Sequence, residues 1–189
     1  HWKSAKHMLR YLKATMDYKM TFWRDPDGIV LLGYTDADYG GNIDSRRSTS
    51  GYCFSLQKGS AMVSWRSKLQ TTVALSTAES EVAAATAGAQ EAVHLHGLLD
   101  DLGVPQTLPV TIMVDNQACI ALSKNPVQQG KTKHFAIKLH FMRDLCTDKF
   151  LVLTYLSTEN MPADILTKFL GGLKTTRFCG QILGFEPKI

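Results

Sequence analysis

The chain contains five short apolar runs and several stretches of helical periodicity. The first three runs are separated by short polar or glycine-rich segments, which predicts an antiparallel meander. The predicted strands lie at residues 29–36, 51–56, 61–65, 110–115 and 150–156, and the predicted helices at residues 77–102, 116–123, 133–146 and from residue 162 onward. We therefore expect an α/β fold with a five-stranded mixed sheet, flanked by helices, whose first three strands are antiparallel.

The two ends of the chain differ in pattern from this middle part. Residues 3–15 have apolar side chains at helical spacing with basic residues between them, which predicts an amphipathic helix, and residues 20–23 predict a short strand. After residue 170, two glycines interrupt the pattern, and residues 178–185 are expected to form a helix that docks back. We therefore divide the chain into parts 1–28, 29–170 and 171–189.

Composition narrows the class of protein. With 189 residues, 44% of them hydrophobic and 20% charged, the chain has the make-up of one globular domain plus an appendage. No apolar run approaches the roughly 20 residues that cross a bilayer, so no membrane role is expected. The four cysteines form no C-x-x-C pair, which argues against a zinc site or a disulfide framework and favours reduced, intracellular thiols. The chain starts without methionine inside a helical pattern, as a piece of a longer polypeptide would.

Four carboxylates lie at the ends of elements. Asp36 and Asp115 each follow an apolar strand, while Glu81 and Asp164 fall in the first turn of a helix. Ligands in open α/β sheets bind at the carboxyl ends of strands, and carboxylates gathered there would repel one another without a cation. Hard divalent ions such as Mg²⁺ prefer oxygen ligands. The four residues therefore predict a two-metal nuclease site, whereas any one of them alone could be a simple helix cap.

Two further carboxylates leave alternatives open. Asp38 follows Asp36 by two residues, which in a continuing strand would return it to the same face; we expect a loop there and favour Asp36. Glu79 completes a capping box with Ser76, and a residue two positions on lies about 200° around a helix, so Glu81 is favoured as the inward glutamate.

Basic residues are concentrated between residues 124 and 143. Such a stretch is typical of a surface that binds phosphate backbones, although a solvated helix face is the alternative. Its members are Lys124, Lys131, Lys133, His134, Lys138, His140 and Arg143.

Local motifs add a resemblance to a known family. The motifs are YTDADYGG at 34–41, RSTSGY at 47–52, SWRSKLQ at 64–70, ALSTAESE at 74–81, VDNQ at 114–117, KH at 133–134 and ADILTK at 163–168. With the order of elements, they resemble the ribonuclease H domain of a copia-type (Pseudoviridae-like) LTR retrotransposon Pol polyprotein. The resemblance covers about residues 29–170, and residues 1–28 look like the tail of the preceding reverse transcriptase.

The resemblance implies an activity and a location. It implies a ribonuclease H-like fold and cleavage of the RNA strand of an RNA–DNA hybrid during reverse transcription. The cofactor implied is two Mg²⁺ ions, for which Mn²⁺ can substitute, with no organic cofactor. The hybrid and the reverse transcriptase portion of the same polyprotein are the implied partners, and a cytoplasmic virus-like particle is the implied location.

Roles for single residues also follow from the resemblance. Asp36 would bridge both ions, Glu81 and Asp115 would complete one site, and Asp164 would serve the other. The candidate contacts to nucleic acid are Ser76, Asn116, Gln117, Lys133, His134 and Lys138.

Other readings remain open at this stage. A catalytically inactive, domesticated scaffold with the same fold would bind nucleic acid without cutting it, and an integrase-like strand transferase would need a different carboxylate arrangement. Residues 157–163 lack the histidine that cellular ribonucleases H carry in that loop. Trp65 is expected in the core rather than on a nucleic-acid surface.

Overall fold

The computed structural model describes residues 1–23, 26, 28–124 and 133–185. Its centre is one five-stranded sheet with the order β3-β2-β1-β4-β5. The first three strands pair antiparallel, and β4 and β5 add in parallel to β1, as the pattern predicted. The strands are β1 (Leu32–Asp38), β2 (Thr49–Ser55), β3 (Met62–Leu69), β4 (Val110–Val114) and β5 (Leu151–Tyr155).

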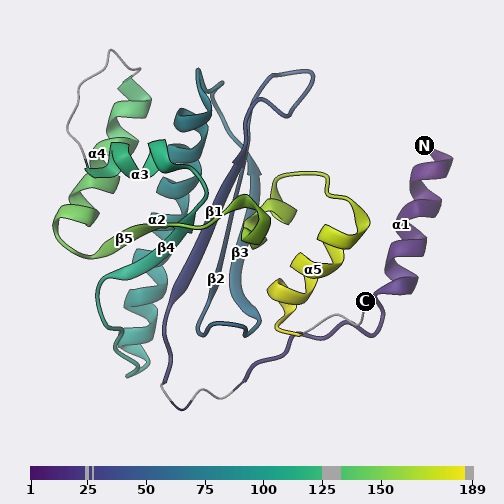
Figure 1. Ribbon diagram of the computed structural model, residues 1–189, viewed down its shortest axis with the longest axis horizontal. Helices are drawn as coiled ribbons and strands as arrows, with labels where there is room; N and C mark the ends of the chain where they lie inside the picture. The colour runs from purple at the N-terminus through teal and green to yellow at the C-terminus, as the bar shows by residue number, and fades with distance from the viewer. Residues whose placement is uncertain (24–25, 27, 125–132, 186–189) are drawn as a thin grey trace.

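Helices cover both faces of this sheet (Figure 1). On one face, α2 (Thr77–Asp101) packs against β1, β2 and β4, with α3 (Gln117–Lys124) and α4 (Lys133–Thr147) beside it. On the other face lie two short 3₁₀ turns, η1 (Thr158–Asn160) and η2 (Pro162–Leu166), and α5 (Gly172–Leu183). In the described part of the chain, no helix is long and apolar enough to cross a membrane.

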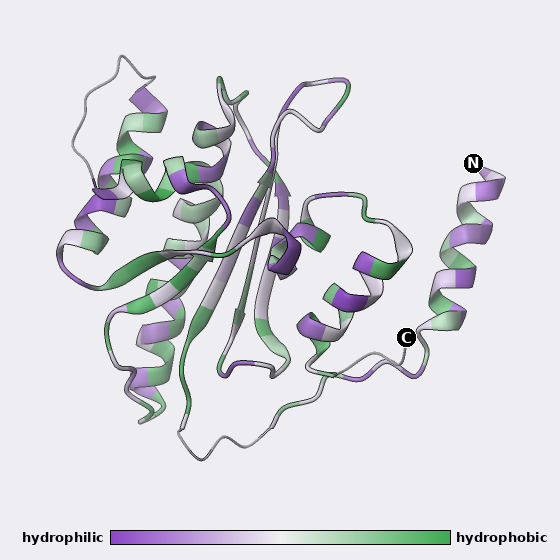
Figure 2. Cartoon of the chain, viewed as in Figure 1, coloured by the Kyte–Doolittle hydropathy of each residue, from purple (hydrophilic) through white to green (hydrophobic). Residues whose placement is uncertain are grey.

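The core divides between the two faces because successive strand residues point to opposite sides. Phe54 packs with Ile112 and Val82 between the sheet and α2, while its neighbour Cys53 packs with Met161 on the η2 side. Strands β4 and β5 are hydrophobic over much of their length, as expected for parallel strands covered on both faces (Figure 2). This two-sided burial fixes the strand ends rigidly, which matters for the carboxylates they hold.

A glycine allows α2 to lie close to the sheet. A Cβ atom at Gly88 would lie 2.5 Å from Cγ2 of Thr35, closer than real Cβ atoms come to a neighbour. Because Thr35 directly precedes Asp36 and Gly88 lies two turns beyond Glu81, this contact sets the spacing between both carboxylates.

Replacing Gly88 with Val should lower the free energy of unfolding by about 1–3 kcal/mol, because the added side chain overpacks the helix–sheet contact. Chemical denaturation of the metal-free protein measures it. Gly97→Val on the same helix is the matched control, since a Cβ there meets no atom within 4 Å. Equal stabilities of the two variants would show that the close approach is unimportant.

Several element boundaries differ from the predictions. Strand β1 continues to Asp38 and β3 to Leu69, because both remain paired with β2. Residues 20–23 are not a strand: Thr21 instead joins two elements, donating its N–H to the Leu183 carbonyl at 2.8 Å and accepting from the Ala61 N–H at 2.9 Å. The segment from residue 162 is a 3₁₀ turn rather than an α-helix. The Asp-Pro-Asp-Gly sequence at residues 25–28, which is typical of a turn, lies partly outside the described residues.

Exposed apolar side chains mark the amino-terminal helix. Helix α1 (Trp2–Ala14) forms where predicted, but it has no buried residue, and it stands apart from the sheet (Figure 1). Met8, Leu9 and Leu12 on its apolar face are all exposed. The expectation that Trp65 lies in the core is wrong, because its side chain on β3 is 55% exposed. Strand periodicity gives the face of a residue but not whether a helix covers that face.

Candidate metal centre

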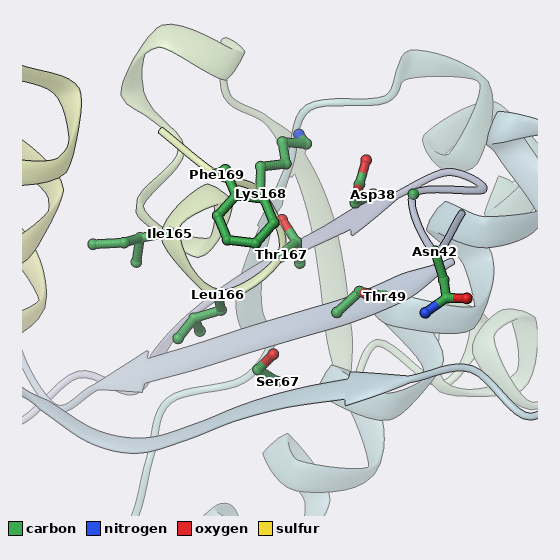
Figure 3. A pocket seen from close by; sticks show the side chains of 10 residues that line it. Asp38, Asn42, Thr49, Ser67, Ile165, Leu166, Thr167, Lys168 and Phe169 are labelled. Atoms are coloured by element: carbon green, nitrogen blue, oxygen red, sulfur yellow. The ribbon is translucent and has the colours of Figure 1, made fainter. Parts of the chain in front are cut away.

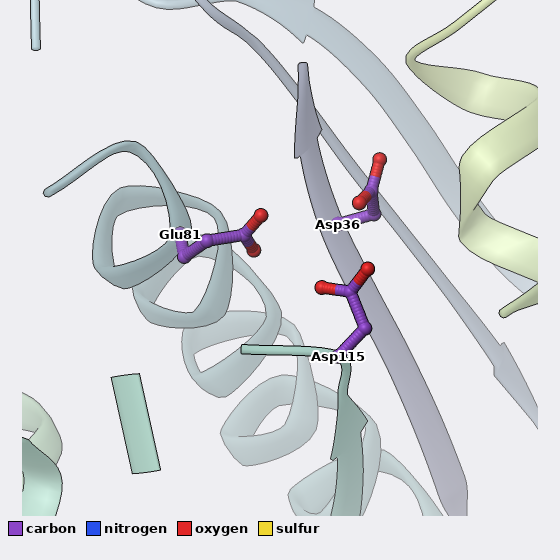
Figure 4. A group of neighbouring side chains, drawn as sticks. All are labelled: Asp36, Glu81 and Asp115. Carbon is purple, nitrogen blue, oxygen red and sulfur yellow. The ribbon is translucent and has the colours of Figure 1, made fainter. Parts of the chain in front are cut away.

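Three carboxylates meet where β1, β4 and α2 converge. The parallel register of β1 and β4 pairs Thr35 with Val114. The residues that follow them, Asp36 on β1 and Asp115 directly after β4, therefore lie next to each other. Glu81 in the early part of α2 reaches toward them (Figure 4). Each residue offers one oxygen, and these three oxygens lie within 4.8 Å of one another. Among the described residues this is the one group of three or more acidic, histidine or cysteine side chains with metal-ligand spacing.

Burial makes this cluster electrostatically costly. Asp36 is fully buried and Glu81 is 4% exposed, and the Oε2 atom of Glu81 has no hydrogen-bond partner. Burial, together with the nearby carboxylates of Asp36 and Asp115, raises the pKa of Glu81 to about 9. A buried carboxylate oxygen with no donor is the feature that a bound cation would satisfy. The donor set, all oxygen, fits a hard divalent ion such as Mg²⁺.

Asp115 lies at the more open side of the cluster. It is half-buried, and the hydroxyl of Thr158 on η1 donates to its Oδ2 at 2.7 Å. This contact holds the carboxylate of Asp115, which faces the side chains of Asp36 and Glu81 (Figure 4). Thr158 was not among the residues singled out from the sequence.

Asp164 lies outside this group of three. It is buried on η2, and its two oxygens accept from two lysines: Lys168 Nζ at 2.9 Å and Lys174 Nζ at 3.1 Å. Lys168 Nζ also donates to Asp36 Oδ1 at 2.8 Å, so one ammonium group joins Asp36 and Asp164. The structure therefore connects Asp164 to the acidic cluster through a lysine.

A second glycine explains how the lysine reaches Asp36. Gly51 on β2 is the register partner of Asp36, and a Cβ there would lie 2.7 Å from Cγ2 of Thr167. The absent side chain lets the residues after η2 lie directly over the sheet, where the Thr167 hydroxyl donates to Asp36. Burial raises the pKa of Asp36, and the contacts with Lys168 and Thr167 oppose that rise. Burial also lowers the pKa of Lys168, but Asp36 and Asp164 raise it by more.

The two alternative carboxylates have other surroundings. Because β1 continues, the expected loop at Asp38 is wrong, and its side chain lines a hollow of about 330 Å³ with Thr167 and Lys168 (Figure 3). Asp38 does not join the group of three. Glu79 caps α2: its carboxylate accepts from the Leu75 N–H at 2.8 Å, and its own N–H donates to Ser76 Oγ at 3.2 Å.

The candidate nucleic-acid contacts lie at the beginnings of α2 and α3 and on α4. Ser76 caps α2, and Asn116 caps α3 by accepting from the Cys119 N–H at 2.9 Å. Gln117, Lys133 and His134 are exposed. Lys138 lines a groove over β3 and α2, together with Tyr52 and Gln70. Two basic residues that were not among the sequence candidates, Arg66 and Lys68, also line this groove. Lys131 lies outside the described residues.

Known proteins resemble this chain in sequence and in fold, although no family model matches it. It is 40% identical over 98% of its length to the retrovirus-related Pol polyprotein from transposon TNT 1-94 of Nicotiana tabacum. It is 34% identical over 96% of its length to that from transposon RE2 of Arabidopsis thaliana. The chain is homologous to part of the Pol polyproteins of plant transposons. It spans only 14% and 12% of the lengths of these two relatives.

The fold of this Pol segment is that of ribonuclease H. LC11-RNase H1, solved in complex with an RNA/DNA hybrid, matches with a TM-score of 0.52 at 15% identity, covering 72% of this chain and 93% of that one. At this identity the match shows the fold alone. The predicted ribonuclease H-like α/β fold is thus confirmed.

Proposed function

We propose that this Pol segment hydrolyses the RNA strand of RNA–DNA hybrids with divalent metal ions held by Asp36, Glu81 and Asp115. The observation that carries the proposal is the convergence of three carboxylates around a buried Glu81 oxygen that has no partner. The ribonuclease H fold supports it, since a structural neighbour was solved with an RNA/DNA hybrid. The relatives, Pol polyproteins, support a role in reverse transcription.

The residues of the metal centre would have different roles because their surroundings differ. Bound Mg²⁺ would activate the attacking water and stabilise the charge that develops on the leaving 3′ oxygen. Asp36 lies on a central strand and its carboxylate is held in place by Lys168 and Thr167, so it would offer a ligand oxygen from a fixed position. Glu81 would give up its proton to become a ligand, and Thr158 would keep Asp115 oriented. The assignment of Asp164 to a second ion stays a prediction.

The hybrid is proposed to lie along the face that carries the groove with Arg66, Lys68 and Lys138, and the exposed Lys133 and His134. Ammonium and guanidinium groups there would contact phosphates without reading sequence. Ser76, Asn116 and Gln117 lie on the elements that border the acidic cluster and are the candidates for contacting the 2′-hydroxyl, which distinguishes RNA from DNA.

Helix α1 is proposed to belong to the reverse transcriptase portion. Its exposed apolar face, with Met8, Leu9 and Leu12, would be covered by that portion in the whole polyprotein. This corresponds to the division into a reverse transcriptase tail at 1–28, a ribonuclease H domain at 29–170 and an extension at 171–189. It would place the protein with the reverse transcription machinery, in a cytoplasmic particle.

Cleavage of a hybrid with a labelled RNA strand, with Mg²⁺ or Mn²⁺, tests the function. We expect cutting of the RNA strand only, and a loss of about two to three powers of ten in rate for Asp115→Asn, because one ligand charge is removed. A duplex of two DNA strands is the substrate control. Tight hybrid binding without cutting, both by this chain and by the chain joined to its polymerase portion, would favour the inactive scaffold instead.

A further inference from the structure

The two buried aspartates share one lysine ammonium group. Lys168 Nζ lies 2.8 Å from Asp36 Oδ1 and 2.9 Å from Asp164 Oδ1, and both carboxylates are essentially inaccessible to solvent. Lys174 Nζ lies 3.1 Å from the other oxygen of Asp164. A cation thus already stands between the same two side chains that would otherwise hold a second divalent ion.

The site is therefore asymmetric in charge. On the Asp164 side, two lysines balance two buried carboxylates, which satisfies the requirement that buried charges be paired. On the Glu81 side, among the described residues, no cationic side chain forms an ion pair with Glu81 or Asp115, and Glu81 Oε2 has no donor. Among the described residues, the carboxylates on the Glu81 side therefore have no ion-pair partner, whereas those on the Asp164 side do.

We propose that Lys168 is a tethered cation that competes with a divalent ion for the position between Asp36 and Asp164. The inference deepens the proposed function and rests on it. It means that the protein binds one divalent ion well, through Asp36, Glu81 and Asp115, and a second one weakly, because Lys168 must first leave. Lys168 is then a positioning residue that sets the metal requirement of the site.

Covalent placement makes this competition effective. Lys168 lies four residues after Asp164, and Gly51 allows the segment between them to lie against β2, so the ammonium group is held at its partners. The effective concentration of a tethered group is high, and a free ion must displace it as well as shed its own water. The alternative is that the lysine only fastens η2 to the sheet.

Mn²⁺ binding to the full chain, counted by isothermal titration calorimetry at fixed pH and ionic strength, tests the competition. We expect one ion to bind the wild type at least about tenfold more tightly than a second, and Lys168→Met to tighten the second by about tenfold, since it removes a unit charge at contact distance. Lys168→Arg retains the charge and should leave the second ion weak.

Lys58→Met is the matched control, because Lys58 is exposed on the turn between β2 and β3 and forms none of the ion pairs of the site. Should Lys168→Met fold poorly, the wild type still decides: two ions bound with equal affinity would overturn the proposal. So would a folded Lys168→Met with an unchanged second constant. If Glu81→Gln leaves all Mn²⁺ binding unchanged, the proposed metal centre itself fails, which is a separate outcome from an absent lysine effect.

Discussion

Replacing Asp36 with Asn should reduce the rate of RNA-strand cleavage by about three to four powers of ten, the largest loss expected from a single substitution here. Asp36 contributes to the group of three carboxylates and also receives Lys168 and Thr167. The amide removes a negative charge from both contacts while preserving the shape of the side chain. Single-turnover cleavage of a labelled hybrid in Mg²⁺ measures the loss.

Asp38→Asn is the matched control for this prediction. It makes the same chemical change on the same strand, but Asp38 lines the adjacent hollow and lies outside the group of three carboxylates. We expect Asp38→Asn to retain nearly full activity. Circular dichroism spectra and hybrid affinity should match the wild type for both variants, so that the loss is one of chemistry. A larger loss for Asp38→Asn than for Asp36→Asn would reverse the assignment.

The sequence pattern predicted the sheet and the carboxylates because both depend on local rules. Continuous apolar runs identify buried strands, and an acidic residue directly after such a run lies toward the carboxyl end of the strand, as Asp36 does, or just beyond it, as Asp115 does. The capping box accounted for Glu79 and thereby directed Glu81 inward. These inferences require only the residues within one element and the order of the elements.

The lysines of the site depend on contacts that no local rule contains. Lys168 reaches Asp36 only because η2 crosses the sheet above Gly51, and Lys174 reaches Asp164 only because α5 packs against η2. The available signal was a lysine four residues after an aspartate in one turn, a common pair on helix surfaces. For the same reason, periodicity could not show that Trp65 and the apolar face of α1 are left uncovered.

The affinity of the site for Mn²⁺ should rise steeply with pH, by about tenfold per pH unit between about pH 6 and about pH 8. The folded, metal-free protein holds a proton on Glu81 up to a pKa of about 9, against an ordinary value of 4.5, because burial disfavours its charged form. An ion that binds the carboxylate must displace this proton. Lowering the pH below 9 therefore weakens binding, and raising it above 9 brings no further gain. Calorimetric titrations across this pH range measure the slope.

Two further measurements test the role of Glu81 in that slope. Titrations in buffers with different ionisation enthalpies should show release of about one proton per tightly bound ion. In Glu81→Gln the proton is absent, so the remaining affinity should be low and much less dependent on pH. A slope unchanged by Glu81→Gln would assign the proton to another carboxylate. Since a neutral Glu81 removes one of three mutually repelling charges, the proton lets the metal-free protein fold around a site that is fully ionised only when a cation is bound.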